Sequence, residues 1–189
     1  IIHRDFYANY GPAEFYIVSW LFKLFGQNVL AERIFDIFVR AGISTLVYST
    51  LNTYSNRQIA ITTTVICTGY LFAFSFHGYP VFPTLLLALA STLIITKINS
   101  QTYATKTSFF AGILIGISAL FRYDVGFFAF ISHIMSILLL TKFAKYYRTP
   151  LYINPSKILF TYIFGAGLPV GLILLWYFQV NALGSFIHD

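Results

Sequence analysis

Long apolar runs constrain this chain more than any other feature. Six segments are strongly apolar, at 31–54, 59–76, 81–98, 108–121, 125–141 and 158–179. A helix that crosses a bilayer needs ~20 mostly apolar residues, and backbone in lipid must satisfy its own hydrogen bonds, which favours helices over open sheets. The sequence therefore predicts an all-α fold, a polytopic transmembrane helical bundle of about six spans.

Composition excludes several other classes of protein. The chain of 189 residues is 58% hydrophobic and 10% charged, which leaves too few charges to cover a soluble enzyme, a disordered tail or a nucleic-acid module. The net charge of +6 is therefore interpreted against a membrane, and we expect the lipid bilayer and no nucleic acid as partner. A single cysteine, Cys67, excludes disulfides and cysteine-based metal sites.

The connectors between the apolar segments alternate in charge. Those at 55–58, 97–106 and 142–157 hold seven basic residues and no acid, whereas all six acidic residues lie elsewhere. The positive-inside rule places the basic connectors in the cytoplasm. Both ends of the chain, the loop at 76–80 and the turn at 122–124 then lie at the outer face.

One further hydrophobic stretch, at 12–25, is too short to span, and its charges, Glu14 and Lys23, lie at its ends. Its aromatic residues favour a helix that lies in the membrane interface, beginning at Pro12 and ending at Gly26. The alternative is a half-buried connector. The predicted organisation is an outer loop with an interfacial helix at 1–30 and a transmembrane bundle at 31–189.

Ionisable groups near the membrane are the candidates for chemistry. Asp5, next to Arg4, precedes a Gly-Pro turn and is either a site residue or an exposed acid of the opening loop. Arg122 and Asp124 flank a tight turn, where they either pair with each other or bind substrate. If they bind substrate, Arg122 binds a phosphate, and Asp124 orients a sugar hydroxyl or a metal.

The start of the first span carries a third group of charges. Glu32, Asp36 and Arg40 recur at one helix face, so they form either a self-neutralising ladder or the wall of a polar cavity. Arg33 lies beside that face. His77 is a lone histidine of an outer loop. It either contacts substrate or is an ordinary loop residue.

Two features predict packing rather than chemistry. Gly112 and Gly116 form a GxxxG pattern, which predicts a close helix crossing. His133 falls inside an apolar segment, where we expect a neutral, hydrogen-bonded side chain.

The opening run HRDFYANYGPAEFYIVSWLFKLFGQNVLAERIFDIFVRAG resembles the first outer loop of membrane glycosyltransferases of the GT-C class. The resemblance is carried by five spaced features: Arg4-Asp5-Phe6, Gly11-Pro12, Phe15-Tyr16, Leu24-Phe25-Gly26 and Glu32-Arg33. The run GILIGISALFRYDVGFFAF resembles the short turn of the same family, with Arg122 and Asp124 as its arginine-x-aspartate.

The resemblance implies a transferase that moves a sugar from a polyprenyl-phosphate donor to a glycan, lipid or protein acceptor. It implies a bacterial inner membrane with the active face periplasmic. Asp5 would be the catalytic base or the acid that orients the acceptor, and Arg122 or Arg33 would face the leaving phosphate. Arg4, Glu32, Arg33, His77, Arg122 and Asp124 would bind substrate. Some relatives use a divalent metal and others do not, so the cofactor stays open.

The chain departs from the family at both ends. His3 stands where tyrosine is usual, and the relatives carry a span before this loop and more helices after the last one. We therefore expect a fragment of a longer protein, with activity of the fragment alone left open. Two other functions remain: a transporter or flippase that uses the same charges, and a noncatalytic remnant of a glycosyltransferase.

Overall fold

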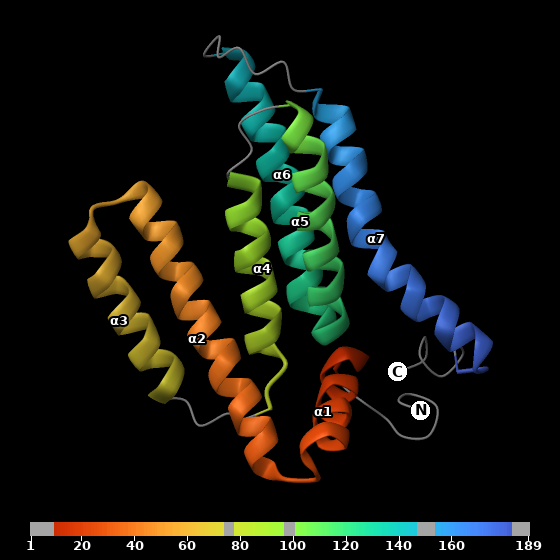
Figure 1. The fold of residues 1–189 in the computed structure, drawn as a ribbon. Coiled ribbons are helices and arrows are strands. Elements are labelled where there is room, and N and C mark those ends of the chain that lie inside the picture. The colour runs from red at the N-terminus through yellow and green to blue at the C-terminus, as the bar shows by residue number, and fades with distance from the viewer. Residues whose placement is uncertain (1–9, 74–77, 97–100, 147–153, 183–189) are drawn as a thin grey trace.

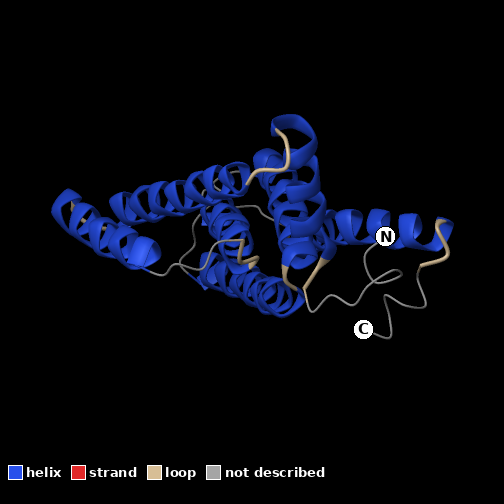
Figure 2. Ribbon diagram, turned by 90° about the horizontal axis from the view of Figure 1, so that it is seen from below, coloured by secondary structure: helices blue, strands red, loops and turns tan. Residues whose placement is uncertain are grey.

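The computed structural model describes residues 10–73, 78–96, 101–146 and 154–182. Every regular element in these ranges is a helix (Figure 2). In chain order they are α1 Pro12–Phe25, α2 Val29–Tyr54, α3 Arg57–Ala73, α4 Val81–Thr96, α5 Gln101–Phe121, α6 Tyr123–Tyr146 and α7 Pro155–Gln179. The predicted all-α class is confirmed for this part of the chain.

The predicted apolar segments correspond to α2 through α7. Three helices are long and apolar enough to cross a membrane: Val29–Tyr54, Ala104–Phe121 within α5 and Ser156–Gln179 within α7. Val81–Thr96 and the Tyr123–Leu139 part of α6 are apolar but shorter. Length and composition thus identify three candidate spans in the described ranges, fewer than the six predicted.

The short apolar stretch forms α1 with the bounds that its sequence predicts. Pro12 occupies the first turn, where its missing N–H costs no hydrogen bond. Gly26 ends the helix with a φ of 82°, a backbone conformation that residues other than glycine rarely adopt. Residues 26–28 then lead directly into α2, whose first turn is capped by the Asn28 side chain.

The helices α2 to α7 run alternately up and down, and α1 lies below them beside the lower ends of α2 and α5 (Figure 1). α5 is central, because it contacts α1, α4, α6 and α7. α2 and α3 form a hairpin that meets the rest of the bundle through α4. We call the lower end, where α1 lies, the α1 end.

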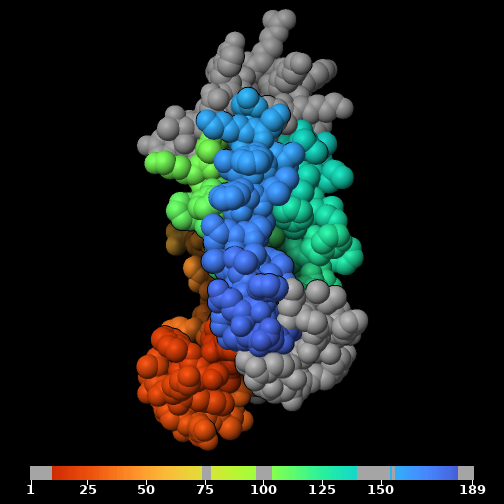
Figure 3. Space-filling model, turned by 90° about the vertical axis from the view of Figure 1, so that its right-hand side faces the viewer, coloured from red at the N-terminus to blue at the C-terminus, as the bar shows by residue number. Residues whose placement is uncertain are grey.

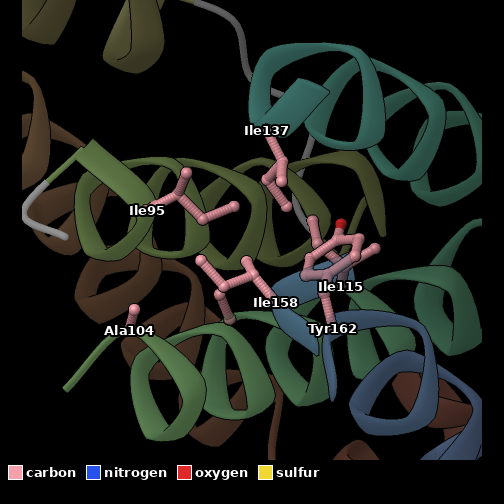
Figure 4. Close-up of a cluster of buried hydrophobic side chains, with 7 residues drawn as sticks. Ile95, Ala104, Ile115, Ile137, Ile158 and Tyr162 are labelled. Atoms are coloured by element: carbon pink, nitrogen blue, oxygen red, sulfur yellow. The ribbon is translucent and has the colours of Figure 1, made fainter. Parts of the chain in front are cut away.

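A hydrophobic cluster holds α4, α5, α6 and α7 together. Ile95, Ile115, Ile137, Ile158 and Tyr162 come from these four helices and point toward one another (Figure 4). All five side chains are nearly inaccessible to solvent. Burial of apolar side chains against one another fixes how these four helices pack.

The predicted GxxxG crossing is present between α5 and α7. A methyl group added at Gly112 would overlap the carbonyl oxygen of Tyr162, and one added at Gly116 would overlap that of Ala166. On the other side, a methyl group at Gly165 would overlap the carbonyl oxygen of Phe109. Small residues from both helices therefore allow the two backbones to touch.

His133 is buried in the same bundle, and its ring nitrogens are hydrogen-bonded as predicted. Its Nε2 lies 2.9 Å from the Thr92 hydroxyl of α4, and its Nδ1 lies 3.0 Å from the Tyr162 hydroxyl of α7. The Ser91 hydroxyl lies 3.3 Å from Nδ1 and donates to the Ala111 carbonyl of α5. This network links four helices through satisfied polar groups.

Candidate functional site at the α1 end of the bundle

The Gly-Pro turn attaches α1 to the end of α5. The Gly11 N–H donates to the Phe121 carbonyl at 3.1 Å, and a methyl group at Gly11 would overlap the Leu120 carbonyl oxygen. Pro12 is buried in this contact. The start of α1 is therefore attached to the turn that carries Arg122.

Arg122 joins three segments that are distant in sequence. Its guanidinium donates to Asp124, at 2.9 Å from Nε to Oδ1, and to the Tyr79 hydroxyl, at 2.7 Å from Nη1. It also lies over the rings of Tyr10 and Tyr79, 5.6 Å from each centroid. The reading in which Arg122 and Asp124 pair with each other is thus the arrangement observed.

The hydrogen bonds that Arg122 donates to Asp124 and Tyr79 raise the pKa of its guanidinium above the ordinary value. The same pair lowers the pKa of the Asp124 carboxyl, since the bond from Arg122 favours its ionised form. Both side chains keep solvent contact, with 25% of Arg122 and 53% of Asp124 exposed. Arg122 and Asp124 therefore form an ion pair at the surface of the α1 end.

The predicted charge ladder on α2 divides into two parts. Asp36 and Arg40 form a buried ion pair at 2.8 Å. Arg40 also donates to the Leu71 carbonyl of α3 and lies 4.4 Å from the Phe82 ring centroid. For these two residues the self-neutralising reading is confirmed. Arg33, which lies beside this face, is exposed.

Glu32, one turn before Asp36, contributes to a polar cavity instead. The cavity has a volume of about 640 Å³. One side of α1 forms most of its wall, and Gln27, Glu32 and Gly78 complete it. The lining residues are Glu14, Phe15, Val18, Ser19, Phe22, Lys23, Gln27, Glu32 and Gly78. Of the predicted site residues in the described ranges, only Glu32 lines this cavity.

Gly78 brings the segment before α4 against Glu32. Its φ of 63° lies in the left-handed region that favours glycine. A methyl group at this position would overlap the Glu32 Oε1 atom. Glycine at position 78 is therefore required by both its backbone conformation and the position of the Glu32 carboxylate.

Glu14 is the functional candidate that sequence reasoning missed. It lines the cavity, only 7% of its surface is exposed, and its Oε2 atom is buried without a hydrogen-bond partner. Burial, followed by the nearby charges of Glu32 and Asp36, raises the pKa of Glu14 to about 7. In the sequence Glu14 is an acid in a first helical turn, a common position that carries no sign of burial.

A second cavity is an apolar groove of about 700 Å³ between α5, α6 and α7. At its α1 end it includes Tyr123 and Asp124, so it begins at the turn that holds Arg122. α7, seen face-on in Figure 3, forms one wall of this groove, and α1 lies at the lower end of that view. The sequence does not reveal the groove, because its walls come from three separated segments. The residues that line the groove are Ile115, Gly116, Ala119, Leu120, Tyr123, Asp124, Gly126, Phe127, Phe130, Ile163, Ala166, Gly167, Val170, Ile173 and Leu174.

Three predicted site residues, Arg4, Asp5 and His77, lie outside the described residues. Within the described ranges, no group of three or more histidine, cysteine, aspartate or glutamate side chains is arranged to hold a metal ion. The site as described thus consists of the polar cavity, the Arg122 turn and the apolar groove.

Comparisons with known protein families, with curated proteins and with solved structures found no match to this chain.

Proposed function

We propose that this chain is part of a membrane glycosyltransferase. It would move a sugar from a polyprenyl-phosphate donor to an acceptor at the outer face of a bacterial inner membrane. One observation carries the proposal: Arg122 bonds to Tyr79, which follows a residue of the acid-lined cavity, and to Asp124, which lines the apolar groove.

The two cavities match the two halves of such a reaction. A polyprenyl chain is apolar and fits a groove lined by aliphatic and aromatic side chains. An acceptor hydroxyl is a weak nucleophile and needs a carboxylate within hydrogen-bond reach. Glu14 and Glu32 line the polar cavity that would hold the acceptor, and Asp5 is the proposed catalytic base.

Arg122 is the proposed partner of the donor phosphate. A phosphate that leaves with extra negative charge is stabilised by a guanidinium, which can donate two parallel hydrogen bonds. In the described structure Asp124 occupies that position, with contacts of 2.9 to 3.2 Å to Nε and Nη2. Because Asp124 is half exposed, the phosphate would replace its carboxylate on Arg122.

The distribution of charge supports an orientation with the α1 end outside. Glu14, Glu32 and Asp124 belong to the first turns of α1, α2 and α6. The basic residues Arg57, Lys106 and Lys157 belong to the beginnings of α3, α5 and α7, which start at the opposite end. With the positive-inside rule, α2 to α7 would be six spans, and α1 would lie in the outer interface.

A transporter is the weaker alternative. It would place ionisable groups on a path through the middle of the bundle, and His133 is the residue to consider there. However, His133 lines neither the polar cavity nor the apolar groove, and its ring nitrogens are already hydrogen-bonded. A noncatalytic remnant is separated from the enzyme by the experiment below.

The test is sugar transfer by the Asp5→Asn protein in membranes, with a radiolabelled polyprenyl-phosphate-linked sugar as donor. Loss of a general base reduces the rate by roughly 10²- to 10⁴-fold, and we expect a loss of that size with unchanged membrane insertion. The matched control is Asp189→Asn, the same change at the other end of the chain. Transfer retained by the Asp5→Asn protein contradicts the role of Asp5, and no transfer by the wild type favours the remnant.

A further inference from the structure

The polar cavity contains more negative than positive charge. Glu14 and Glu32 line it, and Lys23 is the only basic residue among its lining residues. The third nearby acid, Asp36, is neutralised by its ion pair with Arg40. Glu14 therefore shares the cavity with a second carboxylate that acts on it electrostatically. It is also nine-tenths buried, and its Oε2 atom has no partner.

A buried carboxylate oxygen without a partner is unfavourable, and a second carboxylate nearby makes it more so. A neutral hydroxyl from a ligand would supply a hydrogen bond but would leave the repulsion between the two carboxylates. An ammonium group supplies up to three donors and a compensating positive charge. The arrangement therefore favours a cationic ligand over a neutral one.

A divalent metal ion fits the cavity less well than an amine. Calcium binds six to eight oxygen atoms, and magnesium demands octahedral geometry. Within the described part of the chain, the acids near the cavity form no such ligand group. Phe15 and Phe22 occupy part of the wall, and aromatic rings attract organic cations and pack against their apolar stems.

We propose that the polar cavity binds an ammonium group of the acceptor, held between the carboxylates of Glu14 and Glu32. The word acceptor rests on the proposed transferase function, whereas the binding of an amine does not. Lys23 lies on the same wall and repels the ammonium, so it limits the affinity.

The experiment measures binding of two sugar-sized probes to the protein in lipid nanodiscs by equilibrium dialysis. The probes are methyl 6-amino-6-deoxy-α-D-glucopyranoside and methyl α-D-glucopyranoside, which differ by an amine in place of a hydroxyl. Charge-assisted hydrogen bonds predict that the amine binds roughly 10-fold or more tightly than the hydroxyl probe. The proposal is overturned if no binding of the amine probe is detected at millimolar concentration.

Variants assign the preference to the carboxylates. Glu14→Gln and Glu32→Gln should each remove most of the preference for the amine, whereas Lys23→Gln, on the same wall, should increase it because it removes the repulsion. Glutamine keeps the shape of glutamate, and an unchanged melting temperature in Glu32→Gln shows that the cavity is still folded. A preference that survives Glu14→Gln overturns the proposal.

The pH dependence gives a second readout. On the packed elements, the other charged residues are Lys23 on α1 and Glu32, Arg33, Asp36 and Arg40 on α2. The one charged residue of α5, Lys106, lies near its opposite end, and Arg122 follows its α1 end. Because the pKa of Glu14 is about 7, binding of the amine should strengthen from pH 6 to pH 8, and binding of the hydroxyl probe should not. Equal pH profiles for both probes contradict the inference.

The inference and the proposed function fail separately. The Asp5→Asn protein should still prefer the amine, because binding does not need the catalytic base. If the wild type prefers the amine but transfers no sugar, the function is wrong and the site stands. If it transfers sugar without that preference, the function stands and the ammonium site is wrong.

Discussion

A buried histidine in the middle of the bundle and a buried glutamate at the α1 end differ in whether their polar atoms have partners. His133 is surrounded by Ser91, Thr92 and Tyr162, which lie within hydrogen-bond distance of its ring nitrogens. Glu14 is just as inaccessible, yet one of its oxygens has no partner and a second carboxylate lies near. Satisfied polar groups bind helices together, whereas an unsatisfied one costs stability and is expected where a ligand binds.

The largest effect is expected in the middle of the bundle, where the backbones of α5 and α7 touch. Gly165→Ala places a methyl group on the Phe109 carbonyl oxygen, so α5 and α7 must separate. Overpacking costs about 1–3 kcal/mol, and we expect a loss near the upper limit in thermal unfolding of the purified protein. The control is Gly171→Ala in the same helix, where an added methyl group meets nothing within 4 Å. Equal losses in both variants would mean that the crossing is not close.

The pH dependence of stability tests the buried Glu14, whose Oε2 atom has no hydrogen-bond partner. The pKa of Glu14 rises from an ordinary 4.5 to about 7 on folding. The folded state therefore binds more protons than the unfolded state between these values. Stability should fall as the pH rises through this window, by at most about 3 kcal/mol.

The matched variant for this prediction is Glu14→Gln. It should remove the loss between pH 5 and pH 8 and should melt at a higher temperature than the wild type at pH 8. Melting curves at both pH values check the prediction. A wild type whose melting temperature rises over that range, or a less stable Glu14→Gln protein at pH 8, contradicts the burial of a charged Glu14.

A smaller effect is expected from the satisfied network. His133→Leu leaves Ser91 and Thr92 with their backbone acceptors but removes the partner of the Tyr162 hydroxyl. Hydrogen bonds between membrane helices contribute about 0.6 kcal/mol on average and up to about 1.7 kcal/mol, and we expect a loss in that range. Met135→Leu, at an exposed position of α6, should change the melting temperature little. An increase in stability after His133→Leu would show that the network does not hold the helices together.

The parts of the fold that depend on nearby residues could be predicted from the sequence. The Gly-Pro start and the Gly26 stop define α1, and the GxxxG pattern identifies the α5 surface that meets α7. The burial of Glu14 could not be predicted, because it arises only when α1 packs against α2 and α5. In the same way Arg122 meets Tyr79 across 43 residues of sequence, a contact that no local pattern encodes.

The central claim is that the acid-lined α1 end faces the outside. Its most direct test is cysteine labelling in intact cells, in a Cys67→Ser background that has no other cysteine. Ser19→Cys on α1 and Asn56→Cys before α3 lie at opposite ends of α2 and are both exposed. We predict that a membrane-impermeant maleimide labels Ser19→Cys in intact cells and Asn56→Cys only after permeabilisation. The reverse pattern, or labelling of both positions from the same side, would contradict the claim.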